Sequence, residues 1–100
     1  MKSGIASVGS TAISISRELS DLVEPLSFGD PVDVVYNPLV HARRSHEDYL
    51  QRYARSGVRA LLLGMNPGPW GMVQTGVPFG EVQLTREFLG IEEPVEKPAV

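Results

Sequence analysis

The chain has 100 residues, of which 42% are hydrophobic, so it forms at most one domain with a modest core. It contains no cysteine, which excludes disulfides, thiolate metal sites and a cysteine nucleophile. No apolar run approaches the ~20 residues that cross a bilayer, and the N-terminus lacks the apolar core of a secretory signal. These features predict a soluble, cytoplasmic protein.

The formal net charge of −3 argues mildly against a nucleic-acid partner, because phosphate contacts need Lys and Arg. The charge is uneven, however, since five arginines and two acids between residues 41 and 59 give a local charge of +3. The arginines are Arg43, Arg44, Arg52, Arg55 and Arg59. A solvated helix face is the simplest interpretation, and a binding surface is the alternative.

The first expected element is a helix capped by Ser10 or Thr11, after a flexible N-terminus over residues 1–9. Apolar residues then recur at helical spacing until Pro25, which ends the helix because it has no N–H. The β-branched run at residues 32–36 predicts a strand. The dipeptide Asn37-Pro38 predicts a turn after that strand.

Ser45 is expected to begin a second helix, with Asp48 completing a capping box and Gly57 ending the last turn. The short apolar run at residues 58–63 lies between glycines and predicts a buried strand. A third helix is expected over residues 81–89, stopped by Gly90, with an extended segment after it.

This order of helix, strand, helix, strand, loop and helix begins an α/β fold without completing a sheet. Residues 10–100 are therefore expected to be the N-terminal part of a larger domain. His41 and His46 are five residues apart, off the spacing of helical metal pairs, and are expected on the surface with no metal bound. No cofactor is expected.

The segment at residues 64–80 is the most informative part of the chain. It follows the second expected strand, and ligands of open α/β sheets bind beyond the carboxyl ends of strands. Its glycines allow close backbone approach and its prolines hold a shape before a ligand binds. It has neither the spacing nor the lysine of a phosphate loop. Its polar groups, Asn66, Gln74 and Thr75, suit a flat neutral ligand such as a nucleobase.

For single residues in this segment, simpler roles compete with ligand binding. Asn66 alone could form an Asn-Pro turn, the interpretation preferred for Asn37. Core packing is the favoured role of Trp70 and the alternative role of Phe79. Met65 is of a residue type that more often fills a core than contacts a ligand.

The sequence resembles a known family at this segment. Residues 64–69 (Gly-Met-Asn-Pro-Gly-Pro) and 74–82 (Gln-Thr-Gly-Val-Pro-Phe-Gly-Glu-Val) look like the signature of the single-strand-selective monofunctional uracil-DNA glycosylases. Tyr-Asn-Pro at residues 36–38, the helix around residues 49–53 and Leu-Gly-Ile at residues 89–91 match in the same order. The resemblance covers roughly residues 12–98.

This resemblance implies a three-layer uracil-DNA-glycosylase-like fold and a monofunctional enzyme of base-excision repair that hydrolyses the N-glycosidic bond of uracil, or of 5-substituted uracil, in DNA. It implies that Asn66 is catalytic and positions the attacking water. It further implies that the backbone of Met65 meets the base, that Phe79 stacks on it and that Gly68 leaves space beside its C5 atom.

The family also reads the uracil edge with a second asparagine and stabilises the leaving base with a histidine, and the resemblance places both beyond Val100. The alternative is accordingly a non-catalytic fragment that binds a nucleobase or DNA and needs the missing half. The resemblance further implies uracil-containing DNA, single- or double-stranded, as the partner, a monomer when full-length, and a nuclear location in a eukaryote.

Overall fold

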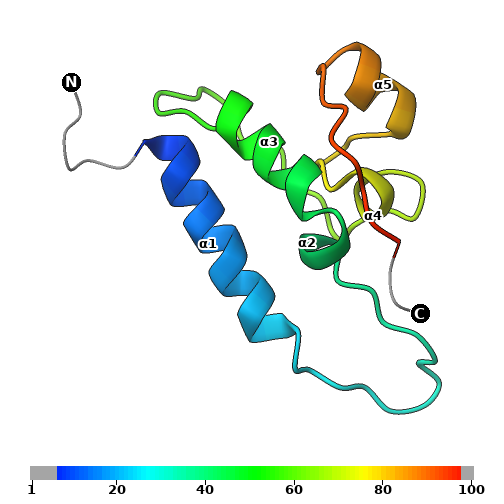
Figure 1. Ribbon diagram of the computed structural model, residues 1–100. Helices are drawn as coiled ribbons and strands as arrows, with labels where there is room; N and C mark the ends of the chain where they lie inside the picture. Colours follow the sequence, from blue (N-terminus) through cyan, green and yellow to red (C-terminus); the bar gives the residue numbers. More distant parts are fainter. Residues whose placement is uncertain (1–6, 98–100) are drawn as a thin grey trace.

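The computed structural model describes residues 7–97, which form helices joined by long extended segments (Figure 1). The helices are α1 (Val8–Val23), α2 (Pro38–His41), α3 (Arg43–Tyr53), α4 (Met72–Thr75) and α5 (Val82–Glu87). No helix in this part of the chain is long and apolar enough to span a membrane.

Helix α1 begins earlier than the sequence predicted. Ser7 is its N-cap, and the Ser7 hydroxyl accepts a hydrogen bond from the Ser10 amide at 3.0 Å. Of the segment predicted to be flexible, residues 1–6 lie outside the described residues, whereas residues 7–9 form the cap and first turn of α1. The helix ends at Val23, just before Pro25, as predicted.

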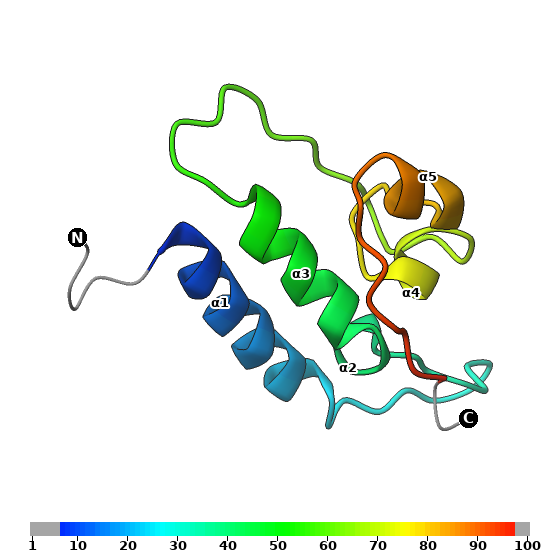
Figure 2. The ribbon, with the colours of Figure 1, turned by 45° about the horizontal axis from the view of Figure 1, so that its top comes forward.

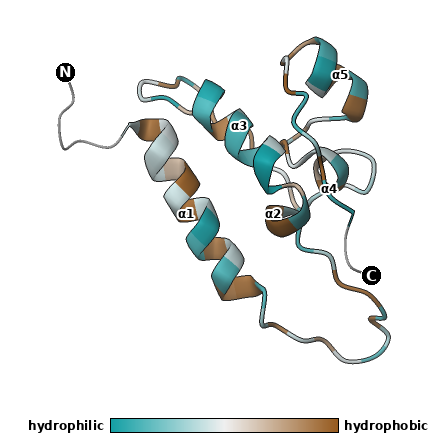
Figure 3. Ribbon diagram, in the orientation of Figure 1, coloured by the Kyte–Doolittle hydropathy of each residue, from teal (hydrophilic) through white to brown (hydrophobic). Residues whose placement is uncertain are grey.

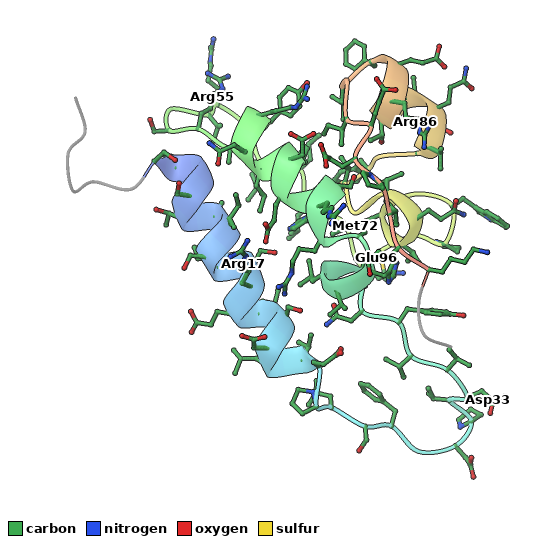
Figure 4. All side chains as sticks on the ribbon, viewed as in Figure 1. Arg17, Asp33, Arg55, Met72, Arg86 and Glu96 are labelled. Atoms are coloured by element: carbon green, nitrogen blue, oxygen red, sulfur yellow. The ribbon has the colours of Figure 1, made fainter. Side chains whose placement is uncertain are left out.

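Helix α1 packs antiparallel against α3, and both views show the two side by side (Figures 1 and 2). At one end the backbones approach closely, because a Cβ atom on Gly9 would lie 3.2 Å from Gln51 Cα. At the middle, Arg17 reaches across to α3 (Figure 4). Its Nε and Nη2 atoms donate to the two carboxylate oxygens of Glu47 at 2.7 and 2.8 Å. This two-bond ion pair fixes the register of the helices.

Asn37 links α1 to α2, and the predicted turn is confirmed in the form of a helix cap. Its Oδ1 accepts from the Leu39 amide at 3.1 Å, and Pro38 occupies the first helical position. Its Nδ2 donates to Ser20 at 3.3 Å and to Glu24 at 3.2 Å. The start of α2 is thereby held against the end of α1.

The predicted capping box at Ser45 is wrong. Helix α3 begins at Arg43, so Ser45 lies inside its first turn and is buried. The Asp48 carboxylate accepts instead from Arg52 Nε at 2.8 Å, one helical turn further on. Helix α3 begins earlier because α2 leads into it through Ala42 alone, and this junction leaves no turn for Ser45 to cap.

The two predicted strands are also not formed within the described residues. Residues 32–36 and 58–63 are extended, but they lie far apart and neither pairs with another segment (Figure 2). The side chains of Leu61, Leu62 and Leu63 are between 77% and 88% exposed. A strand needs a neighbour to bond its backbone, so local sequence alone cannot complete one. The α/β class expected from the sequence is therefore not seen in this part of the chain.

A small core lies where α2, α3, the 71–80 segment and the C-terminal segment meet. Ala42, Val77 and Ile91 are the buried hydrophobic residues of the described chain. The Ile91 amide donates to the Thr85 carbonyl at 3.0 Å, and the Glu96 amide donates to the His41 carbonyl at 2.9 Å. These bonds bring the end of the described chain back across the core to α2, where Figure 4 places Glu96.

The Arg17–Glu47 pair predicts a pH-dependent stability. The hydrogen bond from Arg17 holds the pKa of Glu47 below its ordinary value of 4.5. Because the folded-state pKa lies below the unfolded one, the stabilisation is complete above the unfolded pKa and is lost as the pH falls through the folded pKa. We expect Glu47→Gln to lower the urea midpoint at neutral pH and to have a smaller effect in acid.

The matched control is Glu18→Gln, which removes an exposed carboxylate from the same helix as Arg17. Equal changes in the urea midpoint for the two variants at neutral pH would show that the pair does not hold α1 to α3.

Candidate active site

The segment at residues 64–80 contains a helical turn rather than an uninterrupted loop. Helix α4 begins after a sharp turn in which the Gly68 carbonyl accepts from the amides of Gly71 at 3.3 Å and Val73 at 3.1 Å. Gln74 Nε2 donates to the Pro69 carbonyl at 3.0 Å, which braces the proline-rich half of the turn. Gln74 is therefore committed to the segment's own backbone.

Thr75, expected as a ligand-binding group, is buried and bonds only to its own segment. Its hydroxyl donates to the Gly80 carbonyl at 2.7 Å and accepts from the Val77 amide at 3.1 Å. These two bonds close residues 75–80 into a compact turn. The sequence showed a hydroxyl but could not show that the chain folds back on it.

His41 and His46 were expected on the surface, and the structure corrects this prediction. Both rings are buried, and each bonds to a carbonyl of the segment. His41 Nε2 donates to the Val73 carbonyl at 2.7 Å, and His46 Nδ1 donates to the Gly76 carbonyl at 2.6 Å. Helical periodicity could have found His46, because it lies four residues after the buried Ala42 on the same face.

Gly76 is the closest point between the segment and the helices. It has a φ of 73°, and a Cβ atom there would lie 2.7 Å from the Ala42 carbonyl oxygen and 2.9 Å from Ala42 Cβ. Only glycine fits both the left-handed conformation and this contact. The segment is therefore seated on the junction of α2 and α3.

Phe79 is held in a conformation that is rare for a bulky residue. Its φ is 57°, yet its side chain is 68% exposed, so burial does not compensate for the strain. The ring lies against the start of the segment, because a Cβ atom on Gly64 would be 3.4 Å from Phe79 Cζ. Two parts of the sequence signature, fifteen residues apart, are thus brought together.

Asn66 and Met65 lie beside this contact and are exposed. Met65 is 99% exposed, so its side chain has no packing role in the described chain. Asn66 Nδ2 donates to the Pro67 carbonyl at 3.3 Å, and its Oδ1 has no hydrogen-bond partner among residues 7–97. That carbonyl oxygen is available to accept a hydrogen bond from a water molecule or a ligand.

Two other residues of the segment complete the surface. Gly68 is half-buried, and a Cβ atom there would meet nothing within 4 Å. Trp70, expected in the core, is 80% exposed and lies beside it in sequence, which corrects that expectation. In the part of the chain that the structure describes, no group of three or more His, Cys, Asp or Glu side chains could hold a metal ion.

Comparison with known proteins shows which family the chain is similar to. No family model matches the chain. The single-strand selective monofunctional uracil DNA glycosylase of Bos taurus is 49% identical over 80 residues, which are 80% of this chain and 29% of the relative. The enzymes of the same name from Mus musculus and Rattus norvegicus are 48% identical over 86 residues, which are 86% of this chain and 29% and 30% of those proteins.

All three relatives are named as uracil-DNA glycosylases, a class of DNA-repair hydrolases. This chain belongs to their family, the single-strand-selective monofunctional uracil-DNA glycosylases, which confirms the resemblance inferred from residues 64–82. The chain spans less than a third of the length of these relatives.

The strain at Phe79 generates a prediction about stability. Phe79→Gly removes an exposed ring and places glycine at a positive φ, which costs other residues roughly 1–2 kcal/mol. We expect its free energy of unfolding to stay within about 1 kcal/mol of the parent. The reason is that removal of the backbone strain offsets the greater conformational entropy that glycine loses on folding. Val77→Ala in the same turn should cost about 2 kcal/mol, since Val77 is fully buried.

Urea unfolding monitored by circular dichroism makes the comparison. A loss for Phe79→Gly as large as that for Val77→Ala would assign Phe79 to the core and end its candidacy as a ligand-binding residue.

Proposed function

We propose that this chain carries the water-positioning and base-stacking half of a glycosylase that hydrolyses the N-glycosidic bond of uracil, and of 5-substituted uracils, in DNA. The observation that carries the proposal is the nearness of the Phe79 ring to Gly64, where a Cβ atom would lie 3.4 Å from Phe79 Cζ. It places an exposed aromatic face beside the backbone that leads directly into Met65 and Asn66. Membership of the glycosylase family supports the assignment.

Asn66 is the catalytic residue of this proposal. Cleavage of an N-glycosidic bond passes through an oxocarbenium-like state, as in glycoside hydrolysis. Water attacking an already cationic sugar needs positioning more than deprotonation. The Asn66 Oδ1 atom has no other bond in the described chain, so it accepts a hydrogen from that water and directs its oxygen lone pair toward the sugar. Donation of Nδ2 to Pro67 fixes the orientation of the amide.

Phe79, Met65 and Gly68 bind the base. A base flipped from DNA loses its stacking partners, and the exposed Phe79 ring replaces one of them, which is worth roughly 1–3 kcal/mol. The backbone of Met65 meets the base edge. The half-buried Gly68, with open space where a Cβ atom would project, leaves room for a substituent on C5 of the base.

The three-layer fold of the proposal requires the rest of the protein. Residues 32–36 and 58–63 would become strands of one sheet, which would bury the exposed Leu61, Leu62 and Leu63. A groove of about 860 Å³ lies between α1, α3 and residues 26–39, and its walls are mainly apolar. Figure 3 shows hydrophobic residues both on α1 and in the segment after it. This groove is where we expect the remainder of the complete protein to pack, since the chain spans only 29% of the relative from Bos taurus.

The second candidate, proposed only for the isolated chain, is a non-catalytic fragment that binds a nucleobase or DNA. The exposed leucines favour it for the isolated 100 residues, because Asn66 follows them on an unsupported segment. We propose that the complete protein acts on uracil-containing DNA and is a monomer. We place it in the cytoplasm of a prokaryote or the nucleus of a eukaryote.

The role of Asn66 is tested in a chimera in which this chain replaces the matched portion of the mouse relative. We expect Asn66→Ala to lower kcat for uracil release from a single-stranded oligonucleotide by about a hundredfold, because the attacking water loses its position. Asn37→Ala is the matched control, since it alters the other Asn-Pro pair. It should cost about 1 kcal/mol of stability through the lost helix cap but leave release by the folded protein unchanged. Undiminished release by Asn66→Ala would refute the assignment.

The isolated chain gives a second prediction. We expect it to release uracil at a rate close to the uncatalysed background, while the chimera turns over, because only the chimera has both halves of the site and a complete sheet. The measurement is product release at equal protein concentrations, with the mouse enzyme as a positive control. Turnover by the 100 residues alone would contradict the fragment interpretation.

A further inference from the structure

Two buried histidines bind the candidate active-site segment, and the proposed chemistry uses neither of them. A carbonyl oxygen only accepts hydrogen bonds, so the bonding nitrogens carry the protons: Nε2 of His41 toward Val73, and Nδ1 of His46 toward Gly76. The distances of 2.7 and 2.6 Å describe close bonds. The rings come from α2 and α3, whereas both acceptors belong to the segment.

These bonds hold the part of the segment that carries the exposed Phe79 ring. Gly76 is seated against Ala42, and Phe79 follows only three residues later. The Thr75 hydroxyl, from the residue before Gly76, closes the turn onto the Gly80 carbonyl at 2.7 Å. The turn is therefore closed internally by Thr75 and fixed externally by His46. A displacement of Gly76 would carry the Phe79 ring away from Gly64.

The strained backbone of Phe79 requires such an anchor. A bulky residue at positive φ persists only where its surroundings determine its conformation. The Phe79 side chain is exposed and cannot supply this determination. The bond to Gly76 supplies it, because breaking this bond leaves a buried carbonyl unsatisfied, and the partly buried bond to Val73 adds a second anchor.

We propose that His46 and His41 are positioning residues that hold the base-stacking turn at residues 73–80 in its binding conformation. His46 fixes the Gly76 carbonyl and so the direction of the Phe79 ring, and His41 fixes the Val73 carbonyl within α4. Both rings are too buried to contact DNA, so they act through the backbone of the turn. The link from the turn to uracil binding rests on the proposed function, whereas the anchoring itself does not.

Amide hydrogen exchange of the 100-residue chain, followed by NMR, tests the anchoring. We expect His46→Leu to speed exchange of the Val77 and Gly80 amides by about tenfold, because a buried hydrogen bond to the turn is lost. The amides of Glu24 at the end of α1 and Ala54 at the end of α3 are the internal controls and should not change. His46→Asn, whose amide nitrogen falls near the Nδ1 position, should restore exchange to the parental rate.

His41→Leu and His41→Gln form the parallel pair for the second anchor, since the glutamine amide falls near the Nε2 position. If His46→Leu speeds amide exchange throughout the chain, exchange of the Val77 and Gly80 amides in the two His41 variants decides whether the turn is anchored. The proposal would be overturned if exchange in the turn is unchanged, or if both leucine variants lose protection uniformly along the chain. It would also be overturned if neither amide variant, His46→Asn nor His41→Gln, restores protection.

The consequence for function is measured in the chimera. We expect His46→Leu to raise KM for a uracil-containing oligonucleotide by roughly tenfold with a smaller fall in kcat, because base stacking weakens while Asn66 is unaltered. His46→Asn should recover the parental KM. A chimera that releases no uracil would refute the proposed function while leaving the exchange result intact. A chimera that releases uracil with the same KM in both His46 variants would refute the role of the anchor in base binding.

Discussion

The described structure depends on one close contact, in which Gly76 sits on the junction between α2 and α3. The contact requires a residue without a side chain at a positive φ, because any Cβ atom would overlap Ala42. The next residue, Val77, is fully buried, and the contact brings the Gly76 carbonyl to His46. This contact fixes the position of the turn that follows, including the backbone of Phe79 with its positive φ.

The two halves of the candidate active-site segment differ in what supports them. Residues 71–80 are tied to the helices by buried hydrogen bonds from two histidines and by the internal bonds of Thr75. Residues 58–66 make no backbone hydrogen bond to the rest of the described chain and expose three consecutive leucines. The half that carries Phe79 is thus held by the described helices, while the half that carries Asn66 has no such support among residues 7–97.

Local features were predictable where the physical cause was local. Helix α1 ends before Pro25, Asn37 caps a turn, and α5 stops before Gly90, whose φ is 72°. The predictions failed where partners distant in sequence decide. Ser45 and Asp48 look like a capping box, but α2 leads directly into α3. Both histidines were predicted on the surface. Helical periodicity could have indicated that His46 is buried, but no spacing rule predicts bonds to carbonyls about thirty residues away.

The sequence by itself determined the family, because residues 64–82 carry a signature specific enough to recognise and the curated relatives confirm it. It also singled out Asn66, Met65, Gly68 and Phe79 as candidates, whose roles remain proposals. Only the tertiary structure decided that Thr75 and the two histidines serve the turn rather than the ligand, and that Phe79 lies against Gly64. The physical reason is that residue type specifies what a side chain can bond, whereas the folded chain specifies which partner is within reach.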